Sequence, residues 1–537
     1  MASCKSTGIG PRVAAIAILL VAVGALALRL PRLDQRPMHT DEAVHTVKAG
    51  ILLDTHRYVY DPYEYHGPTH YYCALPFIWA SGARTLADTQ EWMFRIVPVI
   101  FGTALVLLVL GLADGLGWAA AAFAALLTAL SPAMAFYSRY YIQEMLLVFF
   151  TLALLVCLWR YYCRPRWAWA LTAGVALGAM HATKETTVIA AGAIVFATVV
   201  TALWSRGSRV EGVSTDTDRP ARPRWQHLAG GLVLAALVST TLLSAFFTNL
   251  HEPIDAVRAL FTYIGRGAAG AGRADGAHFH DHPWHYYLEM LLFAKYAPGP
   301  WWSEAFIVAL SVVGSLMAFG RAGGDLNKAP SRTLVRFLLL YTLFSIVVYS
   351  AIPYKTPWCM LSFLNGMILL AGVGAVALVR VMPYRVLKGV VVLALLAGAA
   401  QLGMQAYRSA YTFNCDYRNP YVYGHSASDV IRLGERMEAL AAVDDQGHDL
   451  LIKIIAPDGD YWPMPWYLRR FTQVGYWSEI PEDPDAAVII ASTDLEEALN
   501  DRLTGEYMTE YYGLRPEVLI TVFIRSDLWD EFIATRM

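Results

Sequence analysis

Residues 95–113 read RIVPVIFGTALVLLVLGLA, and residues 117–136 follow as GWAAAAFAALLTALSPAMAF. Each run is about as long as the roughly 20 mostly apolar residues that a membrane-spanning helix needs. Further runs of this kind lie near 12–30, 143–162, 167–183, 185–204, 228–249, 303–320, 334–352, 358–379 and 385–405. The sequence therefore predicts a polytopic α-helical membrane protein with about 11 transmembrane helices.

The composition agrees with a membrane protein and excludes several other classes. Of the 537 residues, 56% are hydrophobic and only 16% are charged, against about 25% charged in soluble domains. The formal net charge of −2 shows no basic excess that would indicate a nucleic-acid partner. Six cysteines are too few for a disulfide scaffold. A cleaved signal peptide ending near Ala25-Leu26-Ala27 stays an alternative for the first run.

Lysine and arginine in the short loops predict the orientation, because such residues collect on the cytoplasmic side. With the N-terminus inside, the loops 31–94 and 250–302 and the tail 406–537 are extracytoplasmic, and the protein is a multi-pass cell-membrane protein. The basic residues of the predicted inner loops are Arg160, Arg164 and Arg166; Arg206, Arg209, Arg219, Arg222 and Arg224; Arg321, Lys328, Arg332 and Arg336; and Arg380, Arg385 and Lys388.

Two domains are expected. Residues 1–405 form the transmembrane domain, in which 41–53 and 69–82 are interfacial helices in the first outer loop. Residues 406–537 form a small extracytoplasmic α/β domain. It has helices near 426–442 and 494–503, and strands at 451–455, 487–490 and 518–524. It lacks a Gly-rich phosphate loop, so nucleotide binding is not supported. Its stretch DGDYWPMPWYLRRF, residues 458–471, favours a packed face over glycan stacking.

Three carboxylates are candidates for catalysis at the predicted outer surface. Asp41 and Glu42 stand at a helix start, where acidic residues often only cap the helix. Because that helix is expected to lie on the membrane, a general-base role is also open. Glu144 stands just inside an apolar run, where a charge is costly and indicates function.

Basic and imidazole side chains lie in the same predicted outer region. His66 and His70 flank a Pro turn in HGPTHYY, and Arg139, Lys184 and Lys355 stand at the outer ends of spans. Lysine there can bind a lipid phosphate as a compact cation. Carboxylates and cations at one membrane face are what group transfer from an anionic lipid requires.

A run of histidines in the second outer loop raises the question of a metal. His278, His280, His282 and His285 surround Asp281, and alternating histidines can bind a divalent ion. The Gly-rich run before them favours a solvated tract without tight metal. The metal-site residues are therefore unknown, and a divalent metal stays an open alternative.

Five motifs in order resemble the C-type glycosyltransferase superfamily: DEAVH at 41–45, HGPTHYY at 66–72, SRYYIQEMLL at 138–147, HATKET at 181–186 and IPYKTPW at 352–358. Within it, the chain is similar to the dolichyl-phosphate-mannose protein mannosyltransferase-like group, and most to its prokaryotic branch named for association with flippase activity. The resemblance covers most of 10–405, and the tail also looks like that branch.

The resemblance implies a reaction outside the cytoplasm. A polyprenyl-phosphate-linked sugar is the donor, and a glycan, lipid or protein is the acceptor. Asp41 activates the acceptor, and Arg139, Lys184 and Lys355 hold the leaving phosphate. Glu144 matches an acidic position that is commonly Asp, and Gln143 also departs from the usual pattern. A single displacement would invert the configuration at the sugar carbon that is transferred.

Two other classes stay open. The branch name allows a non-catalytic partner of a flippase for lipid-linked oligosaccharides. A secondary transporter is also open, although transporters usually show repeats and mid-membrane charges, and here the ionisable residues cluster at the outer ends of the spans.

Overall fold

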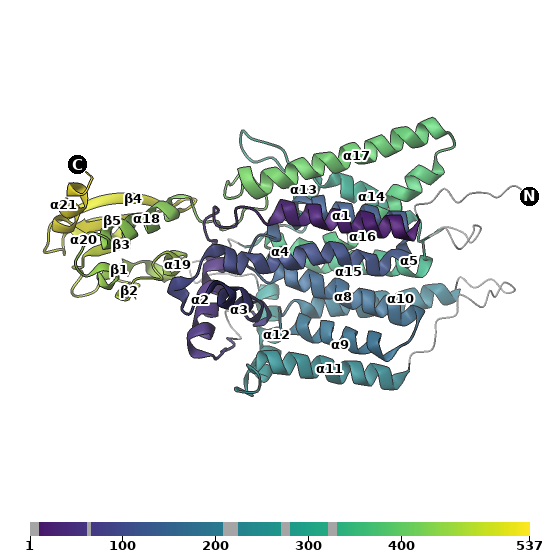
Figure 1. The fold of residues 1–537 in the computed structure, drawn as a ribbon, viewed down its shortest axis with the longest axis horizontal. Helices are drawn as coiled ribbons and strands as arrows, with labels where there is room; N and C mark the ends of the chain where they lie inside the picture. Colours follow the sequence, from purple (N-terminus) through teal and green to yellow (C-terminus); the bar gives the residue numbers. More distant parts are fainter. Residues whose placement is uncertain (1–9, 62–65, 208–223, 270–279, 320–329, 537) are drawn as a thin grey trace, which may run out of the picture.

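The computed structural model describes residues 10–61, 66–207, 224–269, 280–319 and 330–536. Long helices lie side by side in a bundle, and a small region with strands lies beyond one of its ends (Figure 1).

Each predicted span coincides with a helix. The helices are α1 (Pro11–Arg29), α4 (Glu91–Leu108), α6 (Trp118–Leu130), α8 (Glu144–Cys163), α9 (Trp167–His181), α10 (Thr187–Gly207), α11 (Trp225–Leu243), α14 (Ala305–Leu316), α15 (Arg332–Ala351), α16 (Leu361–Val381) and α17 (Arg385–Tyr407). Among the described residues, 8 helices are long and apolar enough to cross a membrane, some with the short turns that continue them. The predicted fold class is confirmed, although α6, α9 and α14 are shorter.

The predicted span 117–136 is broken in two. Helix α6 ends at Leu130, and α7 (Pro132–Tyr137) starts anew after Ser131. The Ser131 hydroxyl accepts from Met134 N at 3.3 Å, and Pro132 takes the first helical position. Proline is favoured there because its missing N–H has no helical partner.

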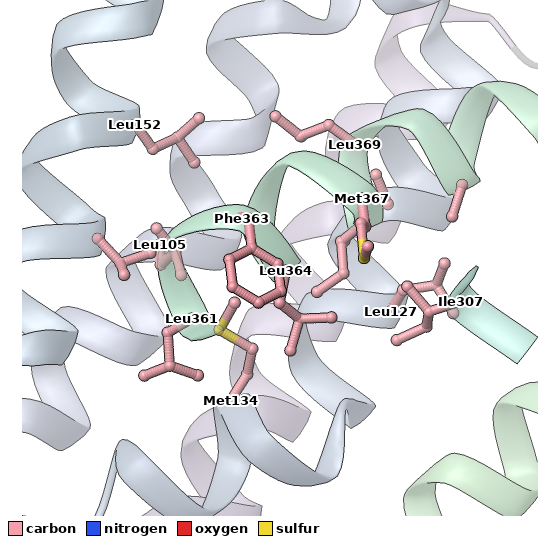
Figure 2. Close-up of a cluster of buried hydrophobic side chains, with 14 of the residues drawn as sticks. Leu105, Leu127, Met134, Leu152, Ile307, Leu361, Phe363, Leu364, Met367 and Leu369 are labelled. Atoms are coloured by element: carbon pink, nitrogen blue, oxygen red, sulfur yellow. The ribbon is translucent and has the colours of Figure 1, made fainter. Parts of the chain in front are cut away.

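Helix α16 forms the centre of the bundle. In the most apolar 18-residue stretch of α16 and the turn before it, 83% of the residues are buried. In the corresponding stretch of α17, at the edge of the bundle, 17% are buried. Figure 2 shows Leu361, Phe363, Leu364, Met367 and Leu369 of α16 among Leu105, Leu127, Met134, Leu152 and Ile307 of the surrounding helices. A Cβ on Gly314 would collide with the Leu370 carbonyl, so glycine lets α14 approach α16 closely.

Shorter helices cover one end of the bundle. They are α2 (Thr40–Thr55) and α3 (Thr69–Ser81), with α12 (Glu252–Ala269) and α13 (Tyr286–Leu292) from the second predicted outer loop. Helices α2 and α3 lie between the bundle and the C-terminal region (Figure 1). Both form where the sequence predicts interfacial helices.

The C-terminal region holds β1 (Ile452–Ile455), β2 (Val474–Trp477), β3 (Val488–Ser492), β4 (Tyr507–Arg515) and β5 (Val518–Arg525), with helices α18 (Asp429–Ala441), α19 (Met464–Tyr467), α20 (Glu496–Asn500) and α21 (Ser526–Ala534). The sheet order is β2-β1-β3-β5-β4. Strand β1 pairs in parallel with β2 and β3, and β5 is antiparallel to β3 and β4. Strands β2 and β4 were not predicted. The division at residue 406 stays a prediction.

The segment 458–471 joins this region to the bundle. Trp466 is fully buried, packs edge-on against Phe94 with ring centroids 5.7 Å apart, and donates to Glu91 Oε1 at 3.0 Å. The Tyr467 hydroxyl accepts from Met38 N at 2.9 Å. One side of this aromatic segment is therefore a packed face that lies close to the start of α2.

Candidate active site

The predicted site residues gather where α2 and α3 meet the end of the bundle. The loops 138–143, 182–186 and 352–356 connect bundle helices at this end. Residues 419–426, which follow α17, lie against them, since the Tyr137 hydroxyl donates to the Tyr421 carbonyl at 2.8 Å. The start of α2, these three loops and residues 419–426 thus form one polar layer at the end of the apolar bundle.

Glu42 is a buried anchor. Its side chain is fully buried and accepts from Arg36 Nη2 at 2.8 Å, from Arg95 Nε and Nη2 at 2.9 and 2.8 Å, and from Tyr141 N at 2.9 Å. It also accepts from His39 N at 3.1 Å, which closes a capping box at the start of α2. Burial alone would raise the pKa of Glu42, but the two guanidinium groups hold it well below its ordinary value. All of its acceptor capacity is used inside the protein.

Asp41 has a different environment. It is half-buried, and its carboxylate makes no hydrogen bond or ion pair with any described residue. Burial raises the pKa of Tyr423, and the nearby Tyr354 and Asp41 carboxylate raise it further. Because no described residue binds this carboxylate, it can accept a proton from a ligand.

Glu144 and Lys184 form a buried ion pair between the start of α8 and the loop before α10. Burial lowers the pKa of Lys184, but Glu144, Cys359 and Glu185 together raise it above its ordinary value, so the ammonium stays charged. Glu144 uses one of the three donors of Lys184. The pair therefore holds a buried cation in the loop between α9 and α10.

His66 belongs to a second polar cluster. Its Nδ1 lies 2.6 Å from Glu185 Oε2, and the Tyr60 hydroxyl donates to Glu185 Oε1 at 2.6 Å. Burial would raise the pKa of Glu185, but His66 and these hydrogen bonds lower it. This cluster ties the loop after α2 to the Lys184 loop.

His70 is fully buried on α3. Its ring lies 4.8 Å from that of His45, and its Nε2 lies 3.4 Å from the amide nitrogen of Gln143. Burial lowers the pKa of both imidazoles well below 6.5, and neighbouring positive groups lower it further. His70 therefore packs as a neutral residue behind the site.

Arg139 is occupied by backbone. It donates to the carbonyls of Arg29 at 2.5 Å, Pro31 at 2.8 Å and Arg32 at 3.0 Å, and to the Tyr411 hydroxyl at 3.2 Å. Burial lowers its pKa to about 10, which leaves it protonated at neutral pH. Its geometry fixes the end of α1 and the start of the first outer loop.

Lys355 pins the second outer loop to the bundle. Its Nζ donates to the His282 carbonyl at 2.9 Å and also to the Ile352 carbonyl, and its N–H donates to the His280 carbonyl at 2.9 Å. Burial lowers the pKa of Lys355, and Asp281 opposes this shift.

The histidines of this loop diverge. His280 Nδ1 lies 2.7 Å from the Tyr423 hydroxyl, His282 stacks on Tyr286 with centroids 4.1 Å apart, and His285 pairs with Glu289. His278 lies outside the described residues. Within the described ranges, no three His, Cys, Asp or Glu side chains are grouped to hold a metal ion.

Several site residues were missed in the sequence. They are Arg36, Arg95, His39, His45 and Tyr423. Arg95 carried a signal, since it is the only charged residue within the run 95–113. His39 and His45 are among the histidines predicted to lie on the outer side, and His45 ends the DEAVH motif, but neither was assigned a role. Their roles, like those of Arg36 and Tyr423, depend on contacts between distant segments, such as His39 Nε2 with the Tyr423 carbonyl at 2.6 Å.

Comparison with known proteins gives one family match. Residues 69–251 match the family described as dolichyl-phosphate-mannose-protein mannosyltransferase. No curated protein matches the chain in sequence.

Solved structures share the fold. ArnT from Cupriavidus metallidurans in the apo state has a TM-score of 0.62 at 14% identity, covering 95% of this chain and 98% of that one. The same protein bound to undecaprenyl phosphate has a TM-score of 0.62 at 15% identity, with the same coverage. AglB from Archaeoglobus fulgidus, an oligosaccharyltransferase in complex with an inhibitory peptide and a dolichol-phosphate, has a TM-score of 0.55 at 12% identity, covering 90% of this chain and 70% of that one.

Proposed function

We propose that this chain is a glycosyltransferase of the C-type superfamily, and that it transfers a sugar from a polyprenyl-phosphate-linked donor to an extracytoplasmic acceptor. The shared fold supports the general reaction. The named neighbours were solved with undecaprenyl phosphate and with a dolichol-phosphate, which are the lipids that such a donor leaves behind.

The observation that carries the proposal is the contrast between Asp41 and Glu42. Glu42 is saturated by two arginines and two backbone N–H groups, whereas the neighbouring Asp41 carboxylate binds no described side chain. The rigid capping box around Glu42 and His39 holds Asp41 in place. Asp41 is thus a positioned base at the surface that a donor and an acceptor would share.

The cations of the site divide into two kinds. Arg139 and Lys355 give their donors mainly to backbone carbonyls, whereas Lys184 has donors beyond its pair with Glu144. We therefore assign the leaving phosphate chiefly to Lys184, with Lys355 holding the loop that covers it. Glu144 keeps Lys184 charged when no phosphate is present.

In the proposed step, Asp41 takes the proton of the acceptor hydroxyl while the oxygen of that hydroxyl attacks the sugar carbon C1. The bond from C1 to the phosphate oxygen breaks, the bonding electron pair stays on that oxygen, and the polyprenyl phosphate leaves. The configuration at C1 inverts. Lys184 stabilises the negative charge of the departing phosphate, which is where such a site gains most.

The first test replaces Asp41. Asp41→Asn keeps the shape but cannot take a proton, so kcat should fall by about 10²–10⁴ with expression and donor binding near normal. The measurement is transfer from polyprenyl-phosphate mannose to membrane acceptors by purified protein. Asp34→Asn, at an exposed position in the same loop, is the matched control and should keep full activity.

Two outcomes would contradict the proposal. If Asp41→Asn leaves both the transfer and the cellular glycan product intact, the catalytic assignment is wrong. If the wild type transfers no sugar in vitro while the cellular product still depends on the protein, a flippase-associated role replaces it.

A further inference from the structure

The topology of the C-terminal sheet creates a crevice away from the site above. In the sheet, β1 and β3 are parallel neighbours. The connection after β1 leads to β2 on one side of this pair, whereas the connection after β3 leads to β4 on the other side, so the two connections diverge. Ligands of open α/β sheets bind at this kind of divergence, beyond the carboxyl ends of the strands. A cavity of ≈ 170 Å³ lies there.

The crevice combines an apolar floor with a polar rim. Its floor includes Ile454, Ile490 and Ile520 of the sheet, and its rim includes four polar side chains: Asp460, Tyr461, Ser492 and Asp494. A concave apolar site with a few convergent polar groups is the usual form of a small-molecule site.

Most of these polar groups lack a protein partner. Among the described residues, the side-chain oxygens of Tyr461, Ser492 and Asp494 make no hydrogen bond, while Asp460 pairs with Arg515. Two hydroxyls and a carboxylate on residues that line one crevice can bind several polar groups of one ligand. The half-buried Tyr461 also brings an aromatic ring to the lining of the crevice.

The charges select the class of ligand. Asp460 and Asp494 disfavour phosphates and carboxylates, and Arg515 is already paired with Asp460. A neutral ring with several hydroxyls satisfies the carboxylate and the hydroxyls and can also lie against an aromatic face. We propose that this crevice binds one neutral sugar unit of a glycan.

The crevice lies on a segment that also contacts the region of the proposed active site. Tyr461 and Met464 line the crevice. Trp466 and Tyr467, two and three residues beyond Met464, contact Glu91 at the start of α4 and Met38 just before α2. One short segment, residues 461–467, therefore contacts the crevice at one end and lies close to α2, the helix that carries Asp41, at the other. That the bound sugar belongs to the acceptor rests on the proposed function; the binding itself does not.

The test uses the full-length protein in detergent and measures saturation-transfer NMR and dissociation constants. The probes are a neutral manno-trisaccharide and a neutral gluco-trisaccharide, with a hexose 1-phosphate and a hexuronate as anionic comparators. The wild type should bind a neutral trisaccharide and neither anion. Asp494→Ala and Tyr461→Leu should each weaken binding at least about tenfold.

Glu482→Ala, at an exposed carboxylate outside the crevice, is the matched control and should bind as the wild type does. The melting temperature of every variant is measured. Tyr461→Phe keeps the ring but loses one of the two hydroxyls, so it should weaken binding less than Tyr461→Leu does. The proposal is overturned if the wild type binds no neutral trisaccharide, prefers the anions, or binds equally well in both crevice variants. Asp41→Asn separates the two proposals, since it should abolish transfer and leave this binding unchanged.

Discussion

Adjacent carboxylates differ here because the fold brings arginines to only one of them. Arg36 and Arg95 both meet Glu42, with side chains 5% and 1% exposed. Glu42→Gln should therefore destabilise the protein by about 3–5 kcal/mol, because two buried cations lose their counter-charge. Thermal unfolding in detergent measures this, and Asp41→Asn is the matched control, which should melt as the wild type does.

The pH dependence of this stabilisation follows from the sign of the shift. The pKa of Glu42 is lowered in the folded state, so its contribution is complete above the unfolded value of about 4.3 and is lost as the pH falls through the folded pKa. The melting-temperature difference between the wild type and Glu42→Gln should stay constant from pH 8 to about 5 and shrink below. A difference that grows on acidification would contradict the ion-pair assignment.

Lys184 has two assigned roles that a double variant separates. Lys184→Met leaves Glu144 buried without a partner, so it should lose both stability and transfer. Adding Glu144→Leu removes that charge and should restore the melting temperature. If Lys184 binds the phosphate, the double variant keeps a KM for the donor raised by about tenfold or more. If transfer recovers together with stability, Lys184 is only a structural partner.

The sequence could predict the residue types of the site but not their division of labour. Asp41 and Glu42 stand at the same helix start, and only the three-dimensional position of Arg95, 53 residues later, distinguishes them. Arg139 and Lys355 look free in their motifs, yet carbonyls from distant segments occupy their donors. The sequence showed which charged residues lie near the membrane face. It could not show which partner each of them binds, because the fold brings those partners from distant segments.

At the scale of elements, apolar length was the most informative signal. It predicted the position of each of the 11 main bundle helices but not the break between α6 and α7, because a run of about 20 apolar residues has few other stable forms. Strands β2 and β4 were missed for a physical reason. They are the edge strands of the sheet and carry exposed or polar residues such as Tyr476 and Tyr511, so no apolar run marks them.

The contact of α19 with the bundle is a second element-scale feature that can be tested. Trp466 is fully buried between Phe94 and Glu91, so Trp466→Ala should cost about 3–5 kcal/mol and loosen the C-terminal region. Limited proteolysis should then cut faster in the segment before α18 (Asp429–Ala441). Trp466→Phe keeps most of the apolar contact and should be milder. Equal proteolysis of Trp466→Ala and the wild type would show that this contact does not hold the two parts together.

At the scale of the whole molecule, site and basic residues occupy opposite ends of the same helices. Helix α8 begins with Glu144 and has Arg160 in its last turn, and α16 follows the Lys355 loop and has Arg380 in its last turn. The 20 residues of α8 rise about 30 Å, which matches the apolar thickness of a bilayer. The C-terminal region lies at the site end (Figure 1).

This polarity, together with the accumulation of basic residues on the cytoplasmic side, predicts that the site and the C-terminal region face away from the cytoplasm. Two single-cysteine variants test it in intact cells. One carries Ala498→Cys in α20, where Ala498 is exposed, and the other keeps only the native Cys163, which is exposed at the basic end of α8. A membrane-impermeant maleimide should label the Ala498→Cys variant at once and the Cys163 variant only after permeabilisation. Because the two positions act as controls for each other, the reverse pattern would invert the topology and move the proposed sugar transfer to the cytoplasmic face, where no acceptor outside the cell could reach Asp41.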